Sequence, residues 1–224
     1  MSNETAFALR RVLVGVLAAL AIPLSSVSAA EPAAAVHAHA HAHAHAHAHA
    51  RALSKDVKVR VADYRLPDVW VVRDDGARVP FATEIDDGRP VVLNFIYTTC
   101  PGVCSMMSHS FSELQDRLGA ERNKVHMVSI SIDPEQDTPA RLRAYAGKFS
   151  AGPQWQHYTG SVGASVAVQK AFDAYRGDKM SHDPLTLMRS APGKPWVRID
   201  GFATGIELVQ LYMDLAALCE GKAV

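Results

Sequence analysis

The sequence predicts an α/β sandwich, in which helices pack against a β-sheet. The continuous apolar run VVLNFIY (91–97) has strand length and is typical of a strand buried on both faces, and the run KVHMVSISID (124–133) is predicted as a second buried strand. Each run precedes a segment with helical features, and strands that alternate with helices indicate an α/β fold. We place this folded domain at residues 59–224.

The first half of the domain is predicted to form a hairpin, a strand and a helix. VWVVRDDGARVPF (69–81) carries an Asp-Asp-Gly turn between two β-rich pieces, which is typical of a hairpin. After the EIDDGRP turn (84–90) comes the first buried strand. One face of a helix follows, because apolar residues recur at spacings of four, four, three and four: Val103, Met107, Phe111, Leu114 and Leu118.

The second half continues the alternation. After the second buried strand, a helix opens with Thr138 as N-cap and Pro139 at its first position. A third helical pattern over 161–175 brings Val162, Val166, Ala167 and Phe172 within reach of a core. PLTLM (184–188) and PWVRID (195–200) flank the turn SAPGK, as in a hairpin, and residues 206–218 form a last helix. This order of elements is that of a thioredoxin-like α/β sandwich, with an N-terminal hairpin and a C-terminal hairpin plus helix.

The N-terminal segment predicts export. Arg10 and Arg11 precede an apolar run over 12–22, and Pro23 and the small-residue stretch SSVSAAE follow, which is the order of a cleaved signal peptide over residues 1–30. An uncleaved membrane anchor is the alternative, although the run is short for a bilayer span. We expect a periplasmic protein, in an oxidising compartment.

Residues 31–58 are expected to be a disordered linker rich in histidine and alanine. Imidazoles alternate with alanine in a mobile array that can bind Cu(II), Ni(II) or Zn(II). We interpret the tract as a metal buffer; repeat slippage without function, or an engineered tag, are the alternatives. The histidines concerned are His37, His39, His41, His43, His45, His47 and His49.

Composition narrows the class of function. The chain has 224 residues with 23 basic and 23 acidic side chains, so nothing indicates an electrostatic binder of nucleic acid or of acidic substrates. Its three cysteines are too few for a disulfide-stapled fold, and paired cysteines are therefore expected to serve redox chemistry or metal binding.

The stretch YTTCPGVC (97–104) places two thiols where a buried strand gives way to a helix. Cys100 is expected in the loop and Cys104 in the first helical turn, where the helix dipole favours a thiolate. A soft dithiolate suits Cu(I), and one added imidazole would also let the site hold Cu(II). A structural disulfide is the alternative, whereas thioredoxin-type exchange normally uses two intervening residues and this motif has three.

Four histidines of the domain are candidates for that imidazole. His109 is expected to point away from the thiols into solvent, and His126 opens the second strand at the opposite end of the sheet. His157, in the WQHYTG connection, is interpreted as a satisfied structural histidine. His182 precedes a strand, in a loop that a thioredoxin-like topology brings next to the dithiol, and the residues alone leave its role open.

The combination of YTTCPGVC, SISIDPEQDTPARLRAYA (129–146) and the downstream His182 resembles the SCO/SenC family of copper proteins, from about residue 64 to residue 218. The resemblance implies a thioredoxin-like fold that binds copper, as Cu(I) and Cu(II), through Cys100, Cys104 and His182. It further implies a role in building the CuA centre of cytochrome c oxidase, by delivering copper or by reducing the cysteines of that centre.

We therefore expect an exported copper chaperone rather than an enzyme. Its expected partners are the CuA-bearing subunit of the oxidase or another copper protein, and a thiol reductant protein. The alternatives are an exported thiol-disulfide reductase, or a redox or copper sensor that delivers no copper. A peroxiredoxin-type peroxidase is disfavoured because Pro101 directly follows Cys100.

Other polar and sulfur side chains near the motif are given supporting roles. We expect Asp133 and Asp137 to cap the following helix and to shape the surroundings of the site. Met107 lies on the apolar helical stripe and is expected in the core, whereas Met106 stays open as an auxiliary ligand. Cys219 is expected to be a half-buried inert thiol, with intermolecular pairing as the alternative.

Overall fold

The computed structural model describes residues 53–219, which belong to one compact unit of the chain. The predicted signal peptide (1–30) and the tract from His37 to His49 lie outside the described residues. Within the described range, no helix combines the length and the apolar character needed to cross a membrane.

Eight strands form one mixed sheet in the described part of the chain, in the order β1-β8-β7-β4-β5-β6-β2-β3. Strands β4, β5 and β6 run parallel to one another, and every other neighbouring pair is antiparallel. The strands are β1 (Lys58–Ala62), β2 (Trp70–Arg73), β3 (Arg78–Pro80), β4 (Val91–Ile96), β5 (His126–Ser131), β6 (Trp155–Gly160), β7 (Leu185–Arg189) and β8 (Trp196–Asp200).

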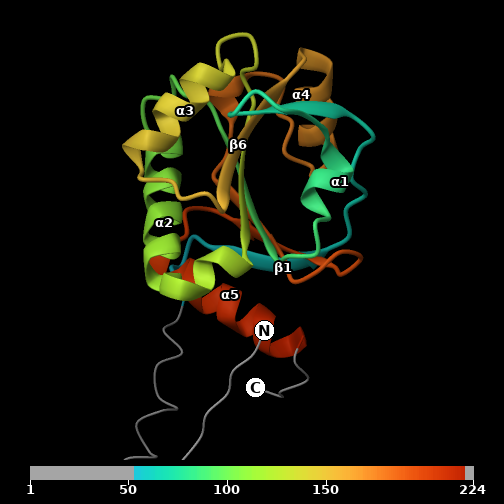
Figure 1. Ribbon diagram of the computed structural model, residues 1–224. Coiled ribbons are helices and arrows are strands. Elements are labelled where there is room, and N and C mark those ends of the chain that lie inside the picture. Colours follow the sequence, from blue (N-terminus) through green and yellow to red (C-terminus); the bar gives the residue numbers. More distant parts are fainter. Residues whose placement is uncertain (1–52, 220–224) are drawn as a thin grey trace, which may run out of the picture. The chain divides into compact units, whose positions relative to one another are not determined.

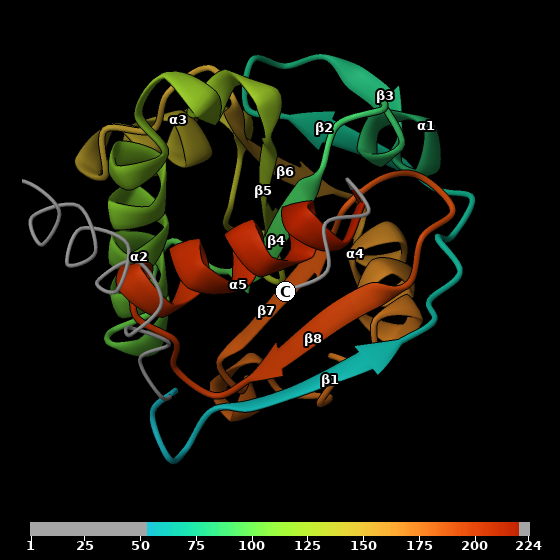
Figure 2. The same cartoon turned by 90° about the horizontal axis from the view of Figure 1, so that it is seen from below.

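Helices cover both faces of this sheet (Figure 1). On one face lie α2 (Val103–Leu118), α3 (Pro139–Lys148) and α5 (Gly205–Cys219), and α5 packs beside α2 (Figure 2). On the other face lie α1 (Phe81–Ile85) and α4 (Val162–Ala171). Two short 3₁₀ helices, η1 (Gly119–Lys124) and η2 (Lys179–Ser181), complete the described elements.

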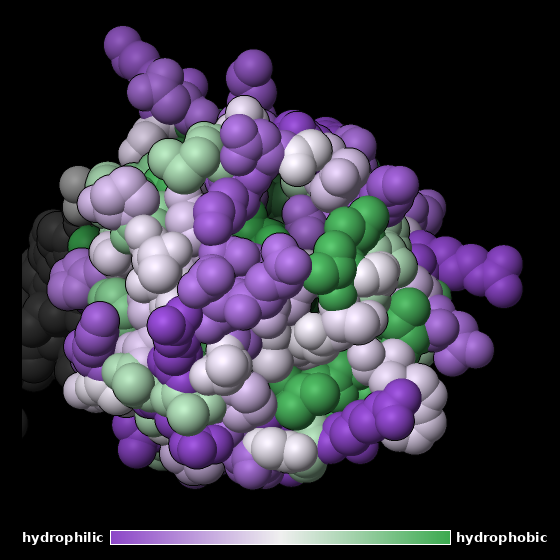
Figure 3. Space-filling model, turned by 90° about the horizontal axis from the view of Figure 1, so that it is seen from above, coloured by the Kyte–Doolittle hydropathy of each residue, from purple (hydrophilic) through white to green (hydrophobic). Residues whose placement is uncertain are grey.

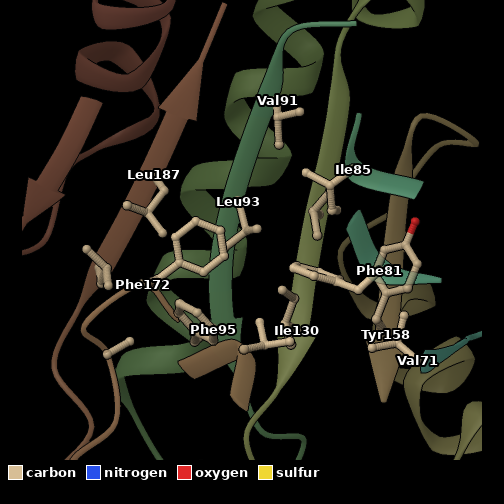
Figure 4. Packing of buried hydrophobic residues seen from close by; sticks show 14 of the residues in the cluster. Val71, Phe81, Ile85, Val91, Leu93, Phe95, Ile130, Tyr158, Phe172 and Leu187 are labelled. Carbon is tan, nitrogen blue, oxygen red and sulfur yellow. The ribbon is translucent and has the colours of Figure 1, made fainter. Parts of the chain in front are cut away.

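The apolar core is divided by the sheet into two layers. Beneath α1 and α4, Phe95, Ile130 and Phe172 pack with residues of β2 and β7 (Figure 4). Beneath α2 and α5, Phe111 and Leu114 pack with residues of β7 and β8. All residues of β4 and β5 are buried, so the prediction of strands buried on both faces is confirmed.

Helix α3 begins as predicted. The Thr138 hydroxyl accepts the backbone N–H of Arg141, and Pro139 occupies the first helical position. Asp133 and Asp137 do not cap this helix, so that part of the expectation is wrong. Their carboxylates bind other partners at the end of β5, as described below.

Several elements depart from the predicted pattern, among them the short helix α1, which was not predicted. Residues 155–160 were predicted as a connection, but they form β6, whose polar side chains are largely buried. The edge strand β1 was not predicted, because its residues are mostly exposed and lack a continuous apolar run. In the third predicted helix, Phe172 reaches the core as predicted, whereas Val162 is exposed and Val166 and Ala167 are only partly buried; the buried positions of α4 are Ala164, Ser165, Val168 and Gln169.

Residues before β1 already contact the folded domain. The carboxylate of Glu207 accepts hydrogen bonds from the backbone N–H and the hydroxyl of Ser54, at 2.6 and 2.7 Å. Its second oxygen accepts from Thr204, which precedes α5. The chain is thus anchored to α5 within the last residues of the stretch predicted as a linker.

Candidate metal centre

The two motif cysteines lie at the end of the sheet where β4 and β5 finish. This end of the molecule presents hydrophobic patches among hydrophilic residues (Figure 3). Strand β4 ends at Ile96, and the loop after Tyr97 carries Cys100 to the start of α2 at Val103. Cys100 is half-buried, Cys104 is fully buried, and both are free thiols. The predicted placement of one thiol in the loop and one in the first helical turn is confirmed.

The Cys100 sulfur caps the N-terminus of α2. Gly102 precedes α2 and offers no side chain, and the backbone N–H of Cys104 donates instead to Cys100 Sγ at 3.3 Å. Burial alone would raise the pKa of Cys100. Hydrogen bonds from the Cys104 thiol, from the backbone at Gly102 and Cys104, and from the Tyr97 hydroxyl outweigh burial and lower the pKa.

Cys104 has the opposite environment. It packs among Ile96, Tyr97, Leu142 and Tyr145 in an apolar cluster. Burial, reinforced by its hydrogen bond to Cys100, raises its pKa well above the ordinary range. The pair therefore contains one thiol that ionises easily and one that stays protonated until a cation or a base compensates the buried charge.

Asp137 ties the cysteine loop to the end of β5. Its fully buried carboxylate accepts from the Thr98 hydroxyl at 2.5 Å, from the Thr98 backbone N–H at 3.2 Å and from the Ser131 hydroxyl at 2.6 Å. Because Thr98 lies two residues before Cys100, this carboxylate sets the position of the loop. The expectation that Asp137 shapes the surroundings of the thiols is consistent with these contacts.

The segment around η2 is fastened to the same end of the sheet at successive points. Lys179 Nζ donates to Asp133 Oδ2 at 2.6 Å. The Tyr97 hydroxyl donates to Met180 Sδ at 3.5 Å, and His182 Nε2 lies 3.2 Å from the carbonyl oxygen of Phe95. These contacts hold the loop that carries His182 next to the strand end that leads to the cysteines.

His182 is not brought together with the thiols in this conformation. Among residues 53–219, no three His, Cys, Asp or Glu side chains lie close enough to one another to hold a metal ion. A carbonyl oxygen only accepts, so the contact with Phe95 places the proton of His182 on Nε2 and leaves the lone pair on Nδ1. Burial lowers the pKa of His182, so the ring is neutral at pH 7, the form that binds metals.

The other three histidines play no part in this centre. His109 is exposed on α2, as predicted, and His126 lies opposite Val91, at the other end of β4 and β5. His157 is buried, but neither ring nitrogen finds a hydrogen-bond partner among the described residues, so the prediction of a satisfied histidine is wrong. Its ring stacks on Trp155, and burial lowers its pKa to about 3, which keeps it neutral.

The two methionines after Cys104 differ in environment. Met107 is buried in α2, as its place on the apolar stripe predicts, and Met106 is 52% exposed. Tyr97 and Met180 also belong to the centre and were missed. Tyr97 opens the motif stretch, which is a usable signal, whereas the separation of 83 positions from Met180 conceals their contact.

Comparison with known proteins agrees with this architecture. The family model described as SCO1/SenC matches residues 72–192, which include the cysteine motif and His182. The chain belongs to the SCO1/SenC family.

Individual SCO1/SenC relatives resemble parts of the chain. A SCO1 protein homolog of Bacillus subtilis is 33% identical over 92 residues, which are 36% of this chain and 48% of that protein. The chain thus spans about half the length of the curated relative that it matches.

Solved structures show the fold. The copper-bound structure of Bradyrhizobium japonicum ScoI has a TM-score of 0.53 at 23% identity, covering 65% of this chain and 96% of that one. The structure of BsSco, described as a member of the Sco family of cytochrome c oxidase assembly proteins with a disulfide switch, has a TM-score of 0.59 at 24% identity. It covers 71% of this chain and 97% of BsSco. The predicted thioredoxin-like α/β fold is confirmed.

The unequal thiols of this SCO1/SenC protein give a direct test of the site. At pH 7 we expect iodoacetamide to modify Cys100 at least about a hundredfold faster than Cys104, because the thiolate is the reactive form and Cys104 is buried. Since the pKa of Cys100 is lowered, its rate should level off at a lower pH than that of a free cysteine. Fragment-ion mass spectrometry after timed quenching separates the two positions. Equal rates for both thiols in the folded protein would show that the described environments are wrong.

Proposed function

We propose that the protein binds copper through Cys100, Cys104 and His182 and acts in the assembly of cytochrome c oxidase. The observation that carries this proposal is the reduced thiol pair at the start of α2, with Cys100 favoured as a thiolate. Two soft sulfur donors one helical turn apart suit Cu(I), whereas harder ions prefer oxygen ligands. The copper-bound ScoI structure, similar in fold, supports the choice of metal.

His182 is the proposed imidazole ligand. Its bond to the carbonyl of Phe95 is the kind of outer contact that orients metal-binding histidines, and it leaves Nδ1 free for copper. A cavity of about 160 Å³, lined in part by Ile132, Val166 and Lys179, adjoins His182. Rotation of the His182 side chain toward the thiols, with the anchored backbone in place, would complete the site.

The proposed action is ligand exchange. The two thiolates hold copper until cysteines of a partner, such as the CuA-bearing subunit of the oxidase or another copper protein, compete for it. Loss of two electrons from the thiols to an oxidant would form a Cys100–Cys104 disulfide and release the metal, and a thiol reductant protein would restore the pair. The description of BsSco as an assembly protein with a disulfide switch supports both steps.

We also propose that the protein works after export, with the histidine tract as a local metal buffer. The support is the order of charged, apolar and small residues over 1–30 and the seven imidazoles from His37 to His49. Copper delivery, reduction of the CuA cysteines, and sensing all use the same thiol pair, and we favour delivery because the site combines soft donors with a nearby imidazole.

A histidine variant separates copper binding from thiol-disulfide exchange. We expect His182→Ala, in the reduced protein lacking residues 1–50, to lower Cu(II) affinity by roughly a hundredfold or more while Cu(I) affinity falls less, because imidazole contributes most to the harder ion. Anaerobic titration against a competing chelator measures both constants. His109→Ala, which removes an exposed imidazole of α2, is the matched control and should change neither.

Two other results would contradict copper binding or the role of His182. If the unmutated protein fails to bind copper tightly while its thiols still reduce a disulfide substrate, the protein is a thiol-disulfide reductase. If His182→Ala leaves the Cu(II) affinity unchanged, His182 is not a ligand.

A further inference from the structure

Met180 is an exposed methionine that does not pack in the hydrophobic core. Its side chain is 65% exposed, whereas Met107, Met127 and Met188 are buried. Its sulfur lies 3.5 Å from the hydroxyl of Tyr97. The single hydrogen of this hydroxyl can point either to Met180 or to Cys100, and its interaction with Cys100 helps to lower the pKa of that thiol. A thioether and a thiol thus share one hydroxyl neighbour at the mouth of the site.

The backbone around Met180 is fixed, although the side chain is exposed. The Asp178 carboxylate accepts the backbone N–H of Met180 at 2.9 Å, and Lys179 is bound to Asp133. The ammonium group of Lys179 also lies 5.6 Å from the centre of the Tyr97 ring. The thioether is therefore presented to the thiol loop from an anchored segment, and a change of side-chain rotamer is enough to redirect its sulfur.

We propose that Met180 is a third sulfur ligand for Cu(I), beside Cys100 and Cys104. This assignment rests on the copper function proposed above. On binding of Cu(I) the thiols would release their remaining protons to solvent, and the Met180 sulfur would exchange its contact with the Tyr97 hydroxyl for a bond to the metal. A thioether is soft and uncharged, so it stabilises Cu(I) without adding negative charge to a partly buried dithiolate.

With Met180 as a ligand, the η2 segment carries two copper ligands that suit different oxidation states of the metal. Met180 and His182 lie two positions apart, one a thioether and the other an imidazole. The soft sulfur favours Cu(I), and the imidazole also accepts Cu(II). Because a neutral thioether leaves more readily than a thiolate, Met180 would also be the first ligand that the cysteines of an acceptor displace.

The test uses the full reduced chain with one equivalent of Cu(I), in competition with bicinchoninate under anaerobic conditions. We expect Met180→Leu, which keeps size and apolar character, to lower Cu(I) affinity by roughly tenfold. X-ray absorption should count three sulfur neighbours per copper in the unmutated protein and two in Met180→Leu. Met213→Leu, which changes a methionine of α5 that is 45% exposed, is the matched control and should match the unmutated protein. Met106→Leu tests the other exposed methionine near the thiols and is expected to keep the third sulfur.

The outcomes separate this inference from the proposed function. If Met180→Leu and the unmutated protein bind Cu(I) equally tightly and with the same number of sulfur neighbours, Met180 is only a cover over Tyr97 and the inference is overturned. If Met106→Leu alone loses the third sulfur, the ligand is Met106 and not Met180. The double variant Cys100→Ser/Cys104→Ser lacks both thiols, so the Cu(I) that it still binds measures the contribution of the histidine tract. If the unmutated chain binds Cu(I) no more tightly than this double variant, the copper function and this inference both fail.

Discussion

Cys100→Ser and Cys104→Ser are each expected to weaken Cu(I) binding by at least about a thousandfold, or roughly 4 kcal/mol. Each change removes one of two thiolates, and a serine hydroxyl is a hard, protonated group that binds Cu(I) poorly. The two variants should differ in stability. Cys104→Ser places a hydroxyl in the apolar cluster around Leu142 and Tyr145, whereas Cys100→Ser changes a half-buried loop position.

Competition titration and urea unfolding of the same samples separate the two effects. Cys219→Ser is the matched control, because the proposed site gives that residue no role, and it should bind Cu(I) as the unmutated protein does. An affinity retained in either motif variant, with the protein folded, would mean that copper binds elsewhere.

Asp137→Ala is expected to lower the free energy of unfolding by about 3 kcal/mol. The change leaves the N–H and hydroxyl of Thr98 and the hydroxyl of Ser131 without their buried acceptor. Since Thr98 leads into the cysteine loop, we also expect the difference in alkylation rate between Cys100 and Cys104 to shrink. Urea unfolding and timed alkylation measure the two effects.

Glu135→Ala is the matched control for this carboxylate. Glu135 lies two positions earlier in the same connection and is exposed, so its removal should change stability by less than about 0.5 kcal/mol. If both variants unfold at the same urea concentration, Asp137 does not organise the loop.

The positions of the thiols could be predicted because they depend on local signals. Strand β4 is buried on both faces and nearly all of its residues are apolar, so the pattern is visible in the chain. The helical spacing that begins at Val103 then marks the strand-to-helix junction. Cys100 and Cys104 fall at that junction, and no long-range information is needed to place them.

Strand β6 could not be recognised in the same way, because burial there depends on partners far along the chain. The Trp155 indole N–H donates to the Ser129 hydroxyl of β5, and the Tyr158 hydroxyl donates to Glu84 of α1. A sequence pattern shows polar residues but not the distant groups that allow them to be buried. Residues 155–160 were therefore predicted as a connection.

The contacts around the candidate site could not be predicted either, for the same reason. The bond between Lys179 and Asp133 joins positions 46 residues apart, and that between Tyr97 and Met180 joins positions 83 apart. Local periodicity carries no information about such pairs. The sequence placed His182 near the thiols through its expected topology, but it could not show that Phe95 holds the imidazole.

The most direct test of the copper site is X-ray absorption at the copper edge on the reduced protein lacking residues 1–50, loaded anaerobically with one equivalent of Cu(II) and measured at once. The proposed site predicts sulfur neighbours from both Cys100 and Cys104 and one imidazole, with the imidazole signal lost in His182→Ala and kept in His109→Ala. A copper ion surrounded by oxygen and nitrogen alone would show that the two thiols do not bind it, and an imidazole signal that persists in His182→Ala would show that His182 is not a ligand.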